Sequence, residues 1–425
     1  MQCRASQLKI LMTNRLQDGS GRRNSFLHKV FKPKTSSMKS INVITYICFT
    51  LFGAATGSAQ CPAPVFASGL RAPTKVIFSQ KDNLLVAEQG TGVPNTGRIS
   101  IIDPQSAAVR TLLDGLPSAL NLLGEQPAPS GPSGLAMRGR TLYVTIGSGN
   151  STLPGPVPGS EIPNPNPSSS LFSSVLEVHF SAEIEKVTSG FTLNAADRDA
   201  LAAGRTISFR AGPGGPVTIR LVTNFPDYVA APRPDFPANV VSSNPFGLVI
   251  HGNSLDVVDA SFNLIAEVNA HSGASSTLVK FANVPNTTQV GPPTVDPVPD
   301  SIHFFGKDLL VTYLTGFPFG PGAARVQLVD ATTGNNQPFI TGLTAAIDVL
   351  SLSARGNTTP QFLVLEFGGA GLSQPGQLLR FSSPMATPSI ISPCLITPTS
   401  MALDERNGAL FITEIGTGNL IRLQL

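Results

Sequence analysis

Short apolar runs alternate with turn residues along most of the chain, and the pattern recurs six times. Each repeat starts with Pro, two residues and an apolar run, and a second β-rich run follows after a turn. The repeats start at Pro73, Pro132, Pro245, Pro299 and Pro398, with a degenerate copy at Ala346. Units of roughly 50 residues built from short strands predict an all-β fold, a six-bladed β-propeller.

The two ends of the chain predict how the ring closes. Apolar segments ending in Gly-Leu precede three repeats, at Gly69-Leu70, Gly115-Leu116 and Gly342-Leu343, and we interpret them as the outermost strands of blades. The last repeat stops at Leu425 after three strands. We therefore expect residues 65–68 to supply the fourth strand of blade six, which would remove an exposed sheet edge.

An insertion at about 181–240 separates the second and third repeats. Residues 195–203 follow the capping residue Asn194 and precede Gly204, which predicts a short helix. Residues 217–221 have the composition of a strand. We interpret the insertion as a distorted outer strand with a flap over one face.

Residues 1–60 have the features of an N-terminal extension followed by a secretory signal peptide. Lys39 precedes an apolar run at 41–52, and small residues follow as far as Ala59. This order predicts cleavage after Ala59, with Met38 as the true start, and a secreted or periplasmic protein. A lipoprotein signal at Cys61 is the alternative. The propeller domain, at 61–425, has no further long apolar run, and thus the mature chain has no predicted membrane span.

Charge and composition exclude several classes of protein. The first 60 residues hold nine basic side chains and one acid, whereas 61–425 hold 20 basic and 25 acidic residues. No basic stripe occurs in the mature chain, which argues against a nucleic-acid partner. The 41% hydrophobic fraction argues against disorder.

Cys61 and Cys394 are the two cysteines that remain after cleavage. An even pair in an oxidising compartment favours a disulfide. However, the expected strand order places the two residues near opposite rims of the propeller, so two separate thiols are an equal alternative.

Acidic residues recur at the end of the second strand of the repeats. This position holds Glu88, Asp259, Glu366 and Glu414, with Ile146 and Tyr313 in the other two repeats. Antiparallel order places these ends on the same rim as the repeat-starting prolines. Four carboxylates converging on the channel could bind calcium, which prefers oxygen ligands. The structural alternative is that each acid accepts backbone N–H bonds of a loop or pairs with an arginine.

No motif of a known catalytic class is intact in the sequence. The nucleophile elbow, the phosphate-binding loop and the dinucleotide fingerprint are missing. His303 is the histidine expected nearest the channel, and Lys75 and Arg98 are the basic residues a quinone cofactor would need. Phe317 and Phe319 could stack on an apolar ligand.

Three stretches, at 69–75, 243–248 and above all 314–326 (LTGFPFGPGAARV), resemble the ScyD/ScyE family of exported propeller proteins. The resemblance spans about 62–425 and implies a six-bladed propeller related to the NHL and TolB-like groups, with no assigned activity. Tyr313 departs from the glutamate expected in that family.

Two function classes follow from the sequence. The first is a non-catalytic scaffold that binds a small molecule, a glycan or an extracellular protein. The alternative is an enzyme, either a calcium-dependent lactonase-like hydrolase or a quinoprotein sugar dehydrogenase, with no catalytic residue assigned. Fold alone does not decide between the two classes.

Overall fold

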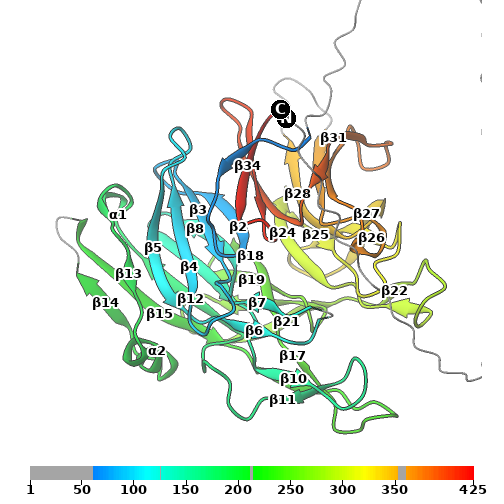
Figure 1. Ribbon diagram of the computed structural model, residues 1–425, viewed down its shortest axis with the longest axis horizontal. Helices are drawn as coiled ribbons and strands as arrows, with labels where there is room; N and C mark the ends of the chain where they lie inside the picture. Colours follow the sequence, from blue (N-terminus) through cyan, green and yellow to red (C-terminus); the bar gives the residue numbers. More distant parts are fainter. Residues whose placement is uncertain (1–60, 125, 211–213, 353–359) are drawn as a thin grey trace, which may run out of the picture. The chain divides into compact units, whose positions relative to one another are not determined.

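The computed structural model describes residues 61–425 except 125, 211–213 and 353–359. The predicted N-terminal extension and signal peptide lie outside the described residues. Six antiparallel sheets form the blades of a β-propeller, as the repeats predict (Figure 1). No helix among the described residues is long and apolar enough to cross a membrane.

In each blade the four regular strands run from the innermost to the outermost in chain order. Blade six differs only in its outermost strand, which comes from the N-terminal end of the described chain. Blade one contains β2 (Pro73–Phe78), β3 (Leu84–Glu88), β4 (Gly97–Ile102) and β5 (Val109–Leu116). Blade two contains β8 (Pro132–Arg138), β9 (Thr141–Ile146), β12 (Ser174–His179) and β15 (Pro216–Asn224). Blade three contains β18 (Pro245–His251), β19 (Ser254–Asp259), β20 (Leu264–Asn269) and β21 (Ser275–Lys280).

The second half of the ring repeats this order. Blade four contains β24 (Pro299–Phe305), β25 (Asp308–Tyr313), β26 (Ala324–Asp330) and β27 (Asn336–Leu343). Blade five contains β28 (Ala346–Leu352), β29 (Gln361–Glu366), β30 (Gly376–Phe381) and β31 (Ser389–Leu395). Blade six contains β32 (Pro398–Asp404), β33 (Ala409–Glu414), β34 (Asn419–Gln424) and β1 (Val65–Ala67).

The N-terminal strand closes the ring, as predicted. β1 pairs antiparallel with β34, with Val65 opposite Ile421 (Figure 1). The apolar side chain of Phe66 packs edge-on against Phe411 at 5.2 Å between ring centroids. Blade six is therefore completed by the two ends of the described chain, and the edge of β34 is covered.

Hydroxyl groups join the innermost strands of neighbouring blades. Every innermost strand has a register shift just after its first residue. Next to these bulges, Thr399 Oγ1 donates to the carbonyl of Pro73, and Thr74 Oγ1 donates to the carbonyl of Pro132. A bulge exposes backbone groups that regular pairing would consume, and here they become inter-blade contacts around the channel.

The insertion between blades two and three extends two blades instead of forming a simple flap. Its strand β15 is the regular fourth strand of blade two, and β14 (Ile207–Arg210) adds a fifth. The two-residue strand β13 (Phe191–Thr192) pairs parallel with β5 of blade one. Helices α1 (Ala182–Val187) and α2 (Ala195–Ala202) carry Ile184 and Leu201 into the shared core of these two blades.

Helix α2 starts where the sequence predicts it. The Asn194 side chain accepts from the Asp197 backbone N–H, and the Asp197 side chain accepts from the Asn194 N–H. This reciprocal arrangement is a capping box, which satisfies donors that the first helical turn leaves free.

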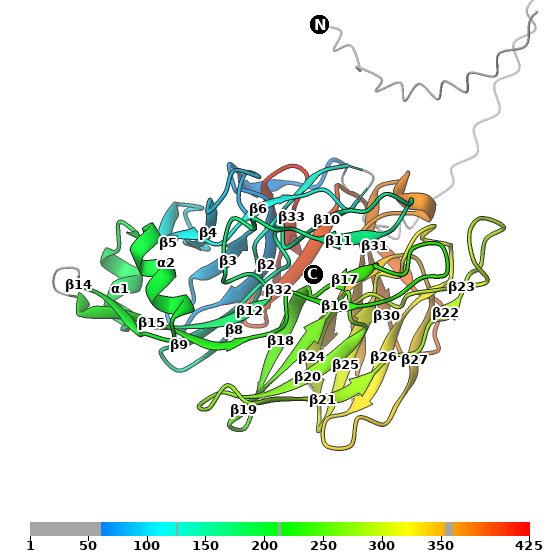
Figure 2. The same cartoon turned by 90° about the horizontal axis from the view of Figure 1, so that it is seen from below.

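In the described part of the chain, four small hairpins lie outside the blades: β6 (Ala119–Asn121) with β7 (Ala128–Ser130), β10 (Thr152–Pro154) with β11 (Glu161–Pro163), β16 (Tyr228–Ala230) with β17 (Val240–Ser242), and β22 (Val284–Pro285) with β23 (Thr294–Val295). The β10–β11 and β16–β17 hairpins lie side by side (Figure 2). A short 3₁₀ turn, η2, spans Ala370–Leu372.

Cys61 and Cys394 form a disulfide, with their Cα atoms 6.0 Å apart. The expectation that they lie near opposite rims is wrong. β1 has only three residues and pairs with the beginning of β34, so the preceding segment does not run down to the far rim. Ala63 of this segment is buried in the apolar core shared by blades five and six, and the preceding Cys61 reaches Cys394 of β31.

Candidate functional site

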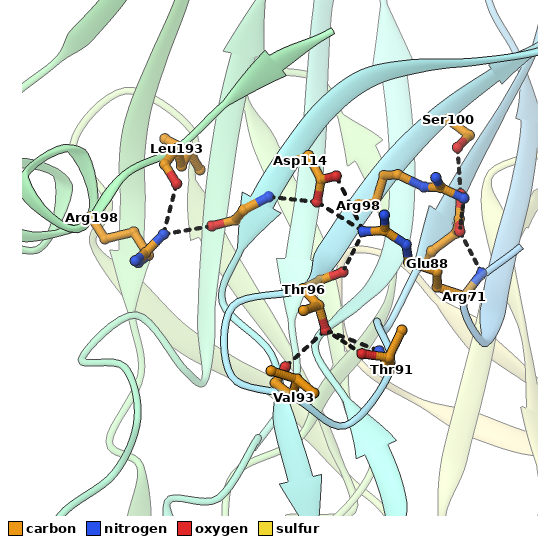
Figure 3. Close-up of polar contacts among 11 residues, drawn as sticks. Arg71, Glu88, Thr91, Val93, Thr96, Arg98, Ser100, Asp114, Leu193 and Arg198 are labelled. Carbon is orange, nitrogen blue, oxygen red and sulfur yellow. Dashed lines mark hydrogen bonds and ion pairs between the residues drawn. The ribbon is translucent and has the colours of Figure 1, made fainter.

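The rim that carries the repeat-starting prolines, here called the Pro rim, holds the four predicted metal-binding acids. Glu88 is fully buried at the end of β3. Its Oε2 accepts from the Arg71 backbone N–H at 2.5 Å and from Arg98 Nη2 at 2.7 Å (Figure 3). The Ser100 hydroxyl donates to Oε1. Arg98, a candidate for clamping a quinone, is thus paired with Glu88 within the same blade.

The other three acids also bind their own loops. Glu366 Oε1 accepts from the Thr344 N–H at 2.7 Å, and Glu414 Oε1 accepts from the Ile396 N–H at 2.7 Å. Burial raises the pKa of Glu366, although two hydrogen bonds oppose that rise. Among the described residues, no three His, Cys, Asp or Glu side chains lie together as they would around a metal ion. Each of the four acids therefore accepts a hydrogen bond from a different loop and holds that loop in place.

Asp259 is the acid of blade three, and it organises the loop that follows β19. Its Oδ1 accepts from the backbone N–H groups of Asn244, Ser261 and Phe262 at 2.9–3.1 Å. Burial raises the pKa of Asp259, and these hydrogen bonds oppose the rise. The side chain thereby fixes the loop conformation at 260–263.

The two repeats without an acid are explained by the same backbone geometry. In three repeats the acid binds the N–H group two residues before the start of the innermost strand, at Arg71, Thr344 and Ile396. In blade four this residue is Pro297, which has no N–H, and Tyr313 replaces the acid. In blade two it is Ser130, which lies in β7, and Ile146 replaces the acid. An acid occurs where a loop N–H needs an acceptor.

A second polar cluster crosses the central channel. It joins Lys75 of β2, His303 of β24 and Asp348 of β28. His303 Nε2 lies 2.7 Å from Asp348 Oδ1, and Lys75 Nζ lies 3.6 Å from Asp348 Oδ2. The sequence singled out Lys75 and His303 for the channel but missed Asp348. Its signal is a carboxylate two residues after the start of an innermost strand, at the position that holds Lys75 in blade one and glycine or serine in the other four blades.

Asp348 is fully buried and remains ionised. Burial favours the neutral acid, but the charges of Lys75 and His303 and a bond from the Met401 N–H at 2.8 Å outweigh it. They hold the pKa of Asp348 well below its usual range. The neighbouring Asp300 behaves in the opposite way: burial raises its pKa well above the ordinary value, and its Oδ2 has no hydrogen-bond partner among the described residues. The two neighbouring carboxyl groups thus have pKa values that are shifted in opposite directions.

A pocket of about 520 Å³ opens between the loops of blades three and four and the inserted hairpins. The loop at 260–263 forms one wall, and residues 296 and 298, just before β24, form another. Glu161 of β11 and the β16–β17 hairpin form the outer side. This volume lies within the range of about 300–1,000 Å³ that is typical of small-molecule sites.

The aromatic side chains of the 314–323 loop are close to one another. The rings of Phe317 and Phe319 pack edge-on with centroids 6.4 Å apart, and Phe317 is 57% exposed. Gly316 in the same loop donates its N–H to the carbonyl of Asp296, at the pocket wall. Phe317 is therefore an exposed apolar side chain that directly follows a residue bonded to the pocket wall.

Comparison with known proteins gives no family assignment: no protein-family model and no curated protein matches the chain. Solved structures of similar fold include an auxiliary nutrient binding protein from Bacteroides thetaiotaomicron, 10% identical over 83% of this chain and 69% of that one, with a TM-score of 0.47. A putative 6-phosphogluconolactonase from Bacteroides uniformis is 13% identical over 84% and 86%, with a TM-score of 0.43. A putative glucose dehydrogenase from Thermus thermophilus is 14% identical over 84% and 98%, with a TM-score of 0.41. The fold assignment rests on the strand topology itself.

Proposed function

We propose that the chain is an exported β-propeller of the ScyD/ScyE type that binds a ligand or an extracellular protein on its Pro rim without converting it. The 314–326 stretch supports the family, and the leader at 38–59 supports export. The observation that carries the binding role is the pocket of about 520 Å³, whose outer side is formed by hairpins added to the repeats. Insertions on a rigid scaffold are where binding surfaces most often lie.

The contacts made by the predicted metal-binding and cofactor-binding residues support a non-catalytic role. A lactonase-like centre would use Glu88, Asp259, Glu366 and Glu414 together, but each of these binds its own loop. A quinone site would use Arg98, which pairs with Glu88. The polar groups of the pocket, in contrast, are arranged around an open volume.

A thermal-shift screen of the purified full chain tests this function. The panel contains sugars, amino acids, nucleosides and organic acids, and each is analysed by mass spectrometry before and after incubation. A ligand at one hundred times its Kd adds about 2.7 kcal/mol of stability. We expect stabilisation by one class of compound, with its mass unchanged. Conversion of the stabilising compound into a product would refute the non-catalytic role.

Export is tested separately by N-terminal sequencing of the chain after secretion from a bacterial host. We expect a mature protein that starts at Gln60, in the periplasm or the medium. A chain that stays in the cytoplasm with its leader intact would contradict this part of the proposal.

A further inference from the structure

The walls of the pocket at the Pro rim of blade three are held rigidly by hydrogen bonds. Asn263 Nδ2 donates to Asp296 Oδ1 at 3.0 Å, and Asn263 Oδ1 accepts from the Val298 N–H at 3.1 Å. These two bonds join the loop of blade three to the loop that enters blade four. The distance between the two walls is therefore fixed before any ligand arrives, which lowers the entropic cost of binding.

The outer wall is fastened in the same way. Glu161 Oε2 accepts from the Ser242 N–H at 3.0 Å and from the Thr152 hydroxyl at 3.0 Å. The Glu161 N–H donates to Asn239 Oδ1 at 2.8 Å. These bonds hold the β10–β11 hairpin against β16–β17, two segments that are far apart in the sequence (Figure 2).

Several polar atoms of the pocket remain open once the walls are formed. Among the described residues, no partner engages the Ser261 hydroxyl, the Lys280 ammonium group or the Asn244 side-chain NH₂. Glu161 and Asp296 each use only one carboxylate oxygen, so each keeps a second oxygen as an acceptor. The pocket thus offers both donors and acceptors.

Apolar groups lie between these polar atoms. The pocket is also lined by Phe262 and by Val229, Ala230 and Val241 of the β16–β17 hairpin. Val229 is 42% exposed. A ligand that fits this surface has hydroxyl groups around its edge and C–H groups on a face, because each can then meet its matching protein group.

We propose that this pocket binds a neutral sugar of one or two rings. The inference rests on the proposed binding function and names the ligand class for it. Two carboxylates and one lysine leave a small negative charge, which disfavours phosphorylated and carboxylated ligands. The lysine and the open amide disfavour a simple cation. A neutral polyol uses donors and acceptors of both kinds.

The test measures sugar binding by calorimetry on the purified full chain. The probes are glucose, galactose, mannose and N-acetylglucosamine, together with cellobiose, lactose and chitobiose. Gluconate, glucose 6-phosphate and spermidine are the charged comparison ligands. Two variants act on the pocket: Lys280→Met removes an open donor, and Ala230→Trp fills the volume from an exposed position on β16. Lys307→Met is the matched control, because Lys307 is also exposed but lies in the turn between β24 and β25, at the end of blade four opposite the Pro rim.

We expect at least one neutral sugar to bind, with Kd at least tenfold higher in both pocket variants and unchanged in Lys307→Met. Sugar binding that Ala230→Trp leaves unchanged would overturn the assignment to this pocket. Tighter binding of a charged comparison ligand than of every neutral sugar would overturn the ligand class.

The outcome also distinguishes this inference from the proposed function. A non-sugar compound that stabilises the chain in the thermal-shift screen, with no sugar binding, would refute the inference and leave the scaffold role standing. A sugar that binds in the pocket and is converted into a product would keep the ligand class and refute the non-catalytic role.

Discussion

Replacing Asp348 by alanine tests whether the channel cluster holds the ring together. Asp348 comes from blade five and contacts three other blades: Lys75 of blade one, His303 of blade four and the Met401 N–H of blade six. The carboxylate is completely buried, and the Lys75 side chain is only 13% exposed. The alanine variant removes the acceptor and leaves a cation and a backbone N–H without their partner.

The size of the effect follows from this burial. Removing one partner of a buried ion pair costs about 3–5 kcal/mol, because the other charge stays buried without compensation. Unfolding entropy of about 2.1 cal/mol/K per residue, over roughly 365 residues, converts 1 kcal/mol into about 1.3 °C. We therefore expect the Tm of Asp348→Ala to fall by about 4–7 °C at pH 7.

Differential scanning calorimetry on both proteins makes this measurement, with Glu183→Ala as the control. Glu183 pairs with Lys186 on α1, and both side chains are more than half exposed. Such a surface pair is worth about 1 kcal/mol or less, so the control Tm should move by at most about 1 °C. A Tm of Asp348→Ala within 1 °C of the wild type, on the order of the control, would refute the view that the cluster fastens the blades.

The pH dependence provides an independent check on the same residue. The pKa of Asp348 is depressed in the folded protein. Its stabilising contribution is therefore present above the unfolded pKa of about 3.9 and is lost as the pH falls through the folded pKa. We expect the Tm difference between the wild type and Asp348→Ala to be full at pH 5–7 and to narrow below about pH 4. A difference that stays constant down to pH 2.5 would indicate lost packing instead of lost charge.

Four further perturbations address other parts of the fold. Asp300→Asn should raise the Tm at pH 7 by about 1–4 °C, because burial raises the pKa of Asp300 and the folded protein therefore loses stability as the pH rises above the unfolded pKa of this acid. Thermal melts at pH 7 and pH 4 measure the effect, and an unchanged Tm at both pH values would contradict the prediction. Burial raises the pKa of Asp256 to about 6, so the free energy of unfolding should fall as the pH rises from 4 to 7. In urea melts over this range, the free energy of unfolding of Asp256→Asn should change less with pH than that of the wild type. Reductant should lower the Tm by about 3–7 °C through the Cys61–Cys394 bond, which closes a loop of 333 residues, but should not affect the double serine variant. Glu88→Gln should lower the Tm equally in calcium and in chelator, whereas a calcium-dependent difference would return Glu88 to a metal site.

The blades and their closure could be predicted because the sequence repeats them. Proline at the start of an innermost strand and Gly-Leu at the end of an outer strand recur at fixed places, and Leu70, Leu116 and Leu343 are all buried. The glycine before each of these leucines has a φ of 76–80°, which glycine adopts without the steric penalty of a side chain. A repeated physical requirement thus leaves a repeated residue.

The contacts between distant segments could not be predicted in the same way. The pairing of β13 with β5 involves only two residues on each strand, which is too short to leave a pattern. Whether Cys61 and Cys394 could pair depended on the path of residues 61–64, which lead from β31 of blade five to β1 of blade six. A segment of four residues carries no pattern that predicts its path. Asp348 lies in the most degenerate repeat, which starts with Ala346 instead of proline. The weak match of this repeat gave no reason to align Asp348 with Lys75 or to place it in the channel.

The acidic positions connect the fold to the proposed site. Where a loop N–H near the innermost strand needs an acceptor, the sequence supplies a carboxylate, and a pattern that suggests four metal ligands arises from four separate backbone requirements. Blade three differs in one respect, because Asp259 also holds the N–H groups of Ser261 and Phe262. Those two residues line the sugar pocket that we propose. The acid of blade three therefore contributes to binding as a positioning residue: a variant such as Asp259→Asn, which weakens its hold on the loop, should raise the Kd for the ligand, whereas Glu414→Gln on blade six should lower the Tm and leave the Kd unchanged.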